Sequence, residues 1–157
     1  KDRYGLLTKI TPLLHGGGQE PGIRSGTLAV HNIVGMGKAA EIAHSNLNEQ
    51  IKKLMDLEKY LTEILIEKFN GQISFNSDGL NKIPGVISVL FKGINNELLV
   101  KNLAPFIAAS TGSACSSSKP SHVLEAIGLS IDDIRSTIRF SLSVFIQKED
   151  LDVFRDL

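Results

Sequence analysis

The chain has 157 residues, of which 42% are hydrophobic and 22% are charged, as is ordinary for a soluble globular domain. Its 17 Lys and Arg balance its 17 Asp and Glu, so no net charge draws it to nucleic acid or to a membrane surface. No apolar run approaches the roughly 20 residues that cross a bilayer. The single cysteine excludes a disulfide within the chain and favours a reducing compartment, so we expect the cytoplasm.

A glycine-rich segment lies near the start of the chain. Residues 15–27, HGGGQEPGIRSGT, hold five glycines and one proline, which exclude a regular helix or strand. The segment does not end in Gly-Lys-Ser or Gly-Lys-Thr, and no G-x-G-x-x-G follows a strand, so nucleotide-binding loops have little support. Arg24, Ser25 and Thr27 precede a predicted helix, where they could bind an anion. An ordinary capped turn explains the same residues.

Two helical segments follow the glycine-rich segment. Thr27 is positioned to cap a helix over residues 28–43. Gly35 and Gly37 lie inside this helix, where glycine costs about 1 kcal/mol relative to alanine, so we expect close packing against a neighbour. Apolar residues at steps of three and four predict a second helix, which an Asn-Gly pair at 70–71 ends. Its apolar positions are Ile51, Leu54, Leu57, Leu61, Leu65 and Phe69.

The remaining residues predict alternating strands and helices. Asn95 and Asn96 can cap one of these helices, and Pro120 opens another. In the last strand, apolar residues alternate with Arg139 and two serines. The order of elements predicts a small α/β layer fold. The predicted strands cover 72–79 (with a turn), 86–91, 106–110 and 138–142, and the predicted helices cover 97–104, 120–127 and 148–157.

Cys115 lies in the segment TGSACSSSKPSH, within a predicted loop over 111–119. Its neighbours on both sides are small, whereas a structural cysteine packs among large apolar residues. A loop of small residues is repositioned at little cost, which suits a thiol that reaches first a substrate and then an acceptor. The residues alone leave a functional and a structural thiol equally open. No second cysteine and no ligand spacing among the four histidines supports a metal site.

Arg139 stands on the polar face of an otherwise apolar predicted strand. A guanidinium has a planar fork of N–H donors, which suits bidentate binding of a carboxylate. Taken alone, however, the pattern is explained better by a solvated arginine at the edge of a sheet.

Four segments in fixed order carry a family resemblance. Together, HGGGQEPGIRSGT, GSACSS, SHVLEAIGLS and STIRFSLS resemble the C-terminal part of the NifS/IscS-type cysteine desulfurases. These belong to the class V aminotransferase family, within the fold-type I pyridoxal-phosphate enzymes. The resemblance spans essentially the whole chain. It implies that residues 1–45 are the end of a large cofactor-binding domain and that 46–157 form a small C-terminal α/β domain.

The same resemblance implies removal of sulfur from L-cysteine with pyridoxal phosphate as the electron sink. The products are L-alanine and an enzyme-bound persulfide for an acceptor protein. Cys115 would attack the substrate sulfur, Arg139 would bind the substrate carboxylate, and Thr27 would contact the cofactor phosphate across a homodimer interface. The family attaches the cofactor to a lysine in a Ser-x-His-Lys setting, which no lysine here has. We therefore expect the chain to be the C-terminal portion of a longer enzyme.

Two other functions stay open at this point. One is a non-catalytic sulfur-relay or interaction module that keeps the thiol loop, and the other is a relative that acts on selenocysteine. The acceptor is also open, since iron–sulfur cluster assembly, tRNA thiolation and DNA phosphorothioation all use enzymes of this kind. The neutral net charge implies that any nucleic acid is reached through a partner protein, and we expect no membrane partner.

Overall fold

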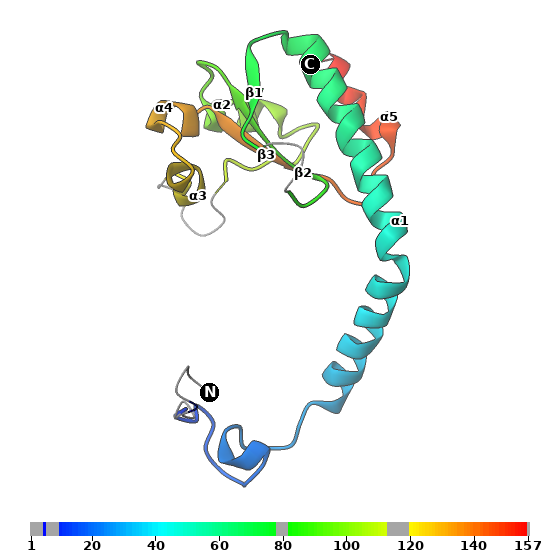
Figure 1. Ribbon diagram of the computed structural model, residues 1–157, viewed down its shortest axis with the longest axis vertical. Coiled ribbons are helices and arrows are strands. Elements are labelled where there is room, and N and C mark those ends of the chain that lie inside the picture. Colours follow the sequence, from blue (N-terminus) through cyan, green and yellow to red (C-terminus); the bar gives the residue numbers. More distant parts are fainter. Residues whose placement is uncertain (1–4, 6–9, 78–81, 113–119, 157) are drawn as a thin grey trace. The chain divides into compact units, whose positions relative to one another are not determined.

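The computed structural model describes residues 5, 10–77, 82–112 and 120–156 (Figure 1). The chain divides into two compact units, Lys1–Ser45 and Asn46–Leu157, and each is described by itself. This division falls at the same position as the predicted domain boundary. The assignment of the first unit to a large cofactor-binding domain stays a prediction.

The first unit holds the glycine-rich segment and the beginning of a long helix. A single 3-10 turn, η1 (Glu20–Gly22), interrupts the segment, and Leu14 forms one parallel bridge with Arg24. The segment otherwise has no helix or strand, as predicted. Among the residues of this unit that the structure describes, only Ser25 is buried.

Helix α1 (Val30–Phe69) is continuous over 40 residues, so the prediction of two separate helices is wrong. Residues 44–50 contain neither glycine nor proline, and nothing in them stops a helix from propagating. The helix ends at Phe69, as the Asn-Gly pair predicted, and Gly71 takes the left-handed conformation with φ of +79°.

The start of α1 differs from the prediction in two ways. The helix begins at Val30, and the carbonyl of Ala29 accepts hydrogen bonds from the amides of Asn32 and Ile33 (3.0 and 3.1 Å), so Thr27 is not its cap. A Cβ atom added at Gly35 or Gly37 would meet nothing within 4 Å in the described part of the chain. No described residue therefore packs against these glycines, and the close packing expected there stays a prediction.

The second unit is built on a three-stranded antiparallel sheet in the order β1-β2-β3. The strands are β1 (Ile73–Phe75), β2 (Val86–Phe91) and β3 (Thr137–Ser141), all close to predicted ranges. The strand predicted over 106–110 is wrong, because only Ser110 forms a bridge, to Arg139. The amides of Phe106 and Ile107 instead donate to the carbonyl of Leu103 (both 2.9 Å), which extends a helical turn.

Five short helices complete this unit. Asn95 caps the first, accepting from two backbone amides at 3.1 Å, as predicted. The second begins at His122 with Ser121 as its cap, two residues after the predicted start at Pro120. The third was not predicted, and the predicted final helix is divided at Asp152. These helices are α2 (Asn96–Leu103), α3 (His122–Ala126), α4 (Ile131–Ile134), α5 (Lys148–Leu151) and α6 (Val153–Asp156).

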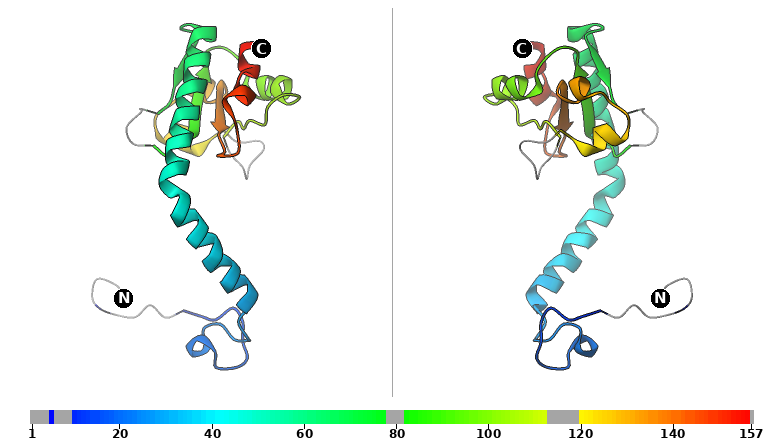
Figure 2. Two further views of the ribbon diagram at one scale, coloured as in Figure 1. Left: turned by 90° about the vertical axis from the view of Figure 1, so that its right-hand side faces the viewer. Right: turned by 90° about the vertical axis from the view of Figure 1, so that its left-hand side faces the viewer.

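The core lies on one face of the sheet. Within this unit, α1, α5 and α6 lie on one side of the sheet, and α3 and α4 lie on the other (Figures 1 and 2). Successive side chains of a strand point to opposite faces, so each strand presents an apolar face and a more polar one. The core cluster is Leu57, Leu61, Ile64, Leu65, Ile87, Val89, Phe91, Leu103, Ile138, Phe140, Leu151 and Phe154.

Candidate active site

Arg139 lies on β3, on the face of the sheet that points away from the core. The residue is half-buried, and its Nε atom is sealed from solvent and forms no hydrogen bond with any described residue. Its Nη1 atom donates to the carbonyl of Gly112 at 3.5 Å, the outer limit of a hydrogen bond. This burial does not fit a solvated arginine at a sheet edge. A sealed N–H group without an acceptor is costly, so the site favours a ligand that accepts.

The backbone of Arg139 is paired on both sides. Its amide donates to the carbonyl of Ser110 (2.7 Å), and its carbonyl accepts from the amide of Ser110 (3.1 Å). In antiparallel sheets a residue exchanges both bonds with one neighbour only, so the pair of Arg139 with Ser88 on β2 is of the non-hydrogen-bonded type. Side chains approach more closely in such pairs. Arg139 is thus flanked on its own face by two small hydroxyl residues.

Cys115 lies outside the described residues, but both ends of its segment are described. Gly112 has φ of +118°, a conformation that favours glycine, and its amide donates to the Ser110 hydroxyl (3.2 Å). A Cβ atom at Gly112 would meet the Cβ atom of Ser121 at 3.2 Å. Ser121 is buried and caps α3. The segment therefore starts and ends at adjoining points, beside the guanidinium of Arg139.

Thr27 lies in the first unit, and its surroundings are described by themselves. Arg24 is engaged, since its Nη1 atom donates to the carbonyls of Gly26 (2.8 Å) and Thr27 (3.1 Å). Ser25 is engaged too, because its hydroxyl donates to the Gly17 carbonyl (2.7 Å). The Thr27 side chain is exposed, and its hydroxyl bonds to no other described residue. The Thr27 hydroxyl thus remains available within the described residues, and as a donor it fits a phosphate oxygen.

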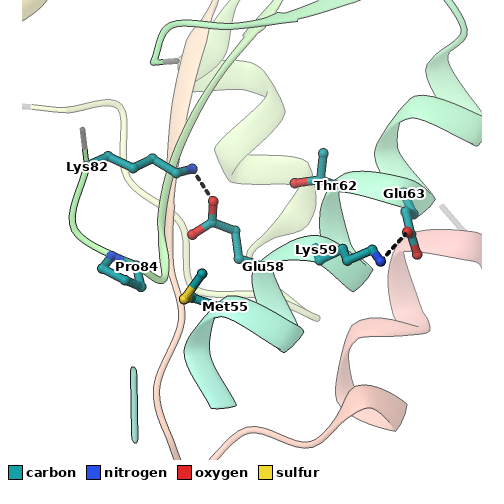
Figure 3. Close-up of a pocket in the computed structure, with 7 residues that line it drawn as sticks. All are labelled: Met55, Glu58, Lys59, Thr62, Glu63, Lys82 and Pro84. Atoms are coloured by element: carbon teal, nitrogen blue, oxygen red, sulfur yellow. Dashed lines mark ion pairs between the residues drawn. The ribbon is translucent and has the colours of Figure 1, made fainter. Parts of the chain in front are cut away.

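A pocket of about 390 Å³ lies between α1 and residues 82–84 (Figure 3). Glu58 and Lys82 form an ion pair there with side chains only 14% and 21% exposed, and Glu58 also accepts from the amide of Gly85 (2.8 Å). Lys59 and Glu63 form a second, exposed pair (3.9 Å). Each charged side chain described in this lining is paired with another, and the bonds of Glu58 tie the turn at residues 82–85 to α1.

A second charged cluster surrounds Tyr60, where α1 packs against the C-terminal helices. The Tyr60 hydroxyl donates to Asp152 (2.6 Å), and Arg155 pairs with Asp152 and Glu67. Contact with Tyr60, followed by the two carboxylates, raises the pKa of Arg155.

The described residues contain no group of three or more histidine, cysteine or acidic side chains that could hold a metal ion. In the same residues, no helix is both long and apolar enough to span a membrane.

The family model of the class-V aminotransferases matches residues 4–154. This chain belongs to the class-V aminotransferase family. The match covers nearly the whole chain, and so confirms the predicted family and, with it, the predicted fold-type I class.

Individual relatives and solved structures are similar to this chain over most of its length. The cysteine desulfurase IscS of Dictyoglomus turgidum is 40% identical over 153 residues, which are 96% of this chain and 39% of that protein. A solved NifS-like protein aligns with a TM-score of 0.78 and 34% identity, over 98% of this chain and 38% of its own. A structure described as SspA in complex with cysteine aligns with a TM-score of 0.50 and 34% identity, over 87% and 37% of the two chains. The chain therefore spans less than two fifths of each relative.

The sequence pointed to Arg139 but not to the residues around it. Ser88 is the one polar residue in the strand VISVLF, and that interruption is the signal that marks it. Ser110 was assigned to a predicted strand with no role of its own. Asn76 follows β1, and no pattern in the sequence connects it to β3.

Proposed function

We propose that the full protein is a pyridoxal-phosphate-dependent cysteine desulfurase and that this chain supplies its C-terminal part. Relatives along nearly all of this chain are cysteine desulfurases, and one structural neighbour is described with cysteine. The observation that carries the proposal is the sealed, unpartnered Nε–H of Arg139 beside the base of the Cys115 segment. A site for an amino acid next to a thiol is what the reaction requires.

Arg139 binds the α-carboxylate of L-cysteine in this proposal. The Nε–H and one terminal N–H of a guanidinium form a fork that matches the two oxygens of a carboxylate. Because Nε is sealed from solvent, water competes poorly for it and the charge-assisted bond is strong. The carboxylate thereby fixes the orientation of the substrate relative to the Cys115 segment.

Cys115 receives the sulfur. Gly112 precedes it by three residues, a distance of at most about 11 Å along the chain. When bound, pyridoxal phosphate supplies an electron sink for the substrate α-carbon. The Cys115 sulfur bonds to the substrate sulfur as the carbon–sulfur bond of the substrate breaks. The carbon takes up a proton and leaves as L-alanine, and the persulfide on Cys115 keeps the transferred sulfur, so the reaction needs no external oxidant or reductant.

Thr27 completes the proposal from the first unit. Its free hydroxyl would donate to the phosphate of a cofactor held by a second copy of the chain, as the family resemblance implies, so the enzyme is a homodimer. The persulfide then passes to an acceptor protein. The reaction belongs in the cytoplasm, because a reducing environment keeps a single thiol free.

The test uses the full-length protein purified with its cofactor. Release of alanine from L-cysteine is measured in the wild type and in Cys115→Ser. We expect the variant to lose persulfide formation and alanine release while it keeps the visible absorbance of the cofactor. Full alanine release by Cys115→Ser would overturn the role of this residue. A full-length protein without pyridoxal phosphate would favour a non-catalytic sulfur relay instead.

A further inference from the structure

A chain of hydrogen bonds crosses the polar face of the sheet. The hydroxyl of Thr137 donates its only proton to the carbonyl of Asp133 (2.8 Å). Its contact with Asn76 (3.3 Å) must therefore be a bond that Thr137 accepts, which places the amide nitrogen of Asn76 against it. The same nitrogen lies 3.1 Å from the hydroxyl oxygen of Ser88 and donates to it.

The Ser88 proton is left without a partner. Since Ser88 accepts from Asn76, its own proton points elsewhere, and no other described residue accepts it. The nearest cross-strand side chain on this face is that of Arg139, in a non-hydrogen-bonded pair whose Cβ atoms are generally about 4.5–5.5 Å apart. A guanidinium cannot accept a hydrogen bond. Two residues paired across the strands thus each have a donor without a partner among the described residues, the Ser88 O–H and the Arg139 Nε–H.

We propose that the Ser88 hydroxyl is a second donor to the carboxylate that Arg139 binds, with Asn76 as the residue that positions it. The inference rests on the proposed function, which supplies the carboxylate. A carboxylate has about four lone-pair sites on two oxygens, so it accepts the fork of Arg139 and one further bond.

The experiment compares four forms of the full-length holoenzyme: wild type, Ser88→Ala, Ser88→Thr and Ser74→Ala. Ser74 is the matched control, since it is a half-buried serine on the same face, on β1 and away from Arg139. Loss of one hydrogen bond to a charged group predicts that Ser88→Ala raises KM for L-cysteine about tenfold, with little change in kcat. Ser88→Thr keeps the hydroxyl and is expected to restore most of the affinity, and Ser74→Ala to match the wild type.

Two further measurements separate this inference from the proposed function. Cysteamine lacks the carboxylate, so its affinity as a competitor is expected to be the same in the wild type and in Ser88→Ala. The Kd for L-alanine, measured by calorimetry, does not depend on turnover and is expected to rise about tenfold in Ser88→Ala. If the wild type releases no alanine but the Kd shifts as expected, the desulfurase proposal fails and the second donor stands. If desulfuration is normal and neither KM nor Kd changes in Ser88→Ala, the second donor is wrong.

Discussion

Arg139 is the centre of the proposed site because three segments of the chain contact it or pair with it. Strand β3 carries the residue, β2 places Ser88 opposite it, and Ser110 closes the far edge through two backbone bonds. The segment that contains Cys115 begins two residues after Ser110, at a glycine whose carbonyl contacts the guanidinium. The anchor proposed for the substrate and the base of the thiol segment are thus parts of one local structure.

Replacing Arg139 by lysine tests the planar fork. Arg139→Lys keeps the charge but loses the bidentate geometry, so we expect KM for L-cysteine to rise at least roughly tenfold. The melting temperature should change little, because the native Nε–H has no protein partner to lose. Arg155→Lys, at an exposed ion pair of the same unit, is the control. An unchanged KM in Arg139→Lys would rule out the fork as the carboxylate anchor.

Replacing Gly112 by alanine tests the base of the thiol segment. The new Cβ atom opposes a φ of +118° and lies 3.2 Å from the Cβ atom of Ser121, so position 112 or Ser121 must move by a few tenths of an ångström. We expect persulfide formation at saturating cysteine to slow by roughly tenfold or more, as misplaced reactive groups do. Gly128→Ala is the control, because it has a positive φ (+91°) but meets nothing within 4 Å in the described residues. Equal rates in the two variants would show that the contact with Ser121 does not matter.

At the residue scale, the sequence identified individual candidate residues but not the burial and hydrogen bonds of their side chains. Arg139 could be found because it interrupts an apolar alternation. The burial of its Nε could not be predicted, since the exposure of one atom depends on the fold around it and not on the pattern along the strand. The turn at Thr27 shows the same limit, because only the fold reveals that the Nη1 atom of Arg24 donates to two carbonyls.

At the scale of elements, the sequence predicted a helix or strand correctly where its own residues supply the cap or the side-chain alternation. Asn95 caps α2 and the alternation along β3 holds, because caps and side-chain periods are set by the residues themselves. The strand predicted over 106–110 is wrong because the amides of Phe106 and Ile107 donate to the carbonyl of Leu103 in a helical turn. A run of apolar residues does not by itself distinguish these outcomes.

The ion pair of Glu58 with Lys82 is predicted to hold the turn before β2 against α1 (Figure 3). Glu58→Ala leaves a largely buried ammonium unpaired and the amide of Gly85 without its acceptor, so we expect a loss of about 2 kcal/mol in unfolding free energy. Glu63→Ala removes the exposed neighbouring pair and should cost less than about 0.5 kcal/mol. Chemical denaturation of both variants checks this, and equal losses would contradict it.

On the scale of the whole molecule, the two units differ in what stabilises them. Every residue of the core cluster lies within the second unit, whereas the described residues of the first unit bury one serine. Apolar side chains at the start of α1, such as Val34 and Met36, are exposed by 66% and 70%.

This difference predicts how pieces of the chain behave. Residues 46–157 contain a complete apolar core, so as a separate fragment they should unfold in urea in one cooperative transition. Residues 1–45 should show no such transition, because burial of apolar surface is the main stabilising term and this unit has little. Circular dichroism and fluorescence that gave different midpoints for the longer fragment would argue against an independent core.

The central claim, that sulfur leaves cysteine for Cys115, is tested most directly by locating the sulfur atom. Full-length enzyme is incubated with L-cysteine, the reaction is stopped by alkylation, and its peptides are examined by mass spectrometry. We expect one additional sulfur atom on the peptide that contains Cys115, in proportion to the alanine released. Release of alanine with no added sulfur on that peptide would contradict it.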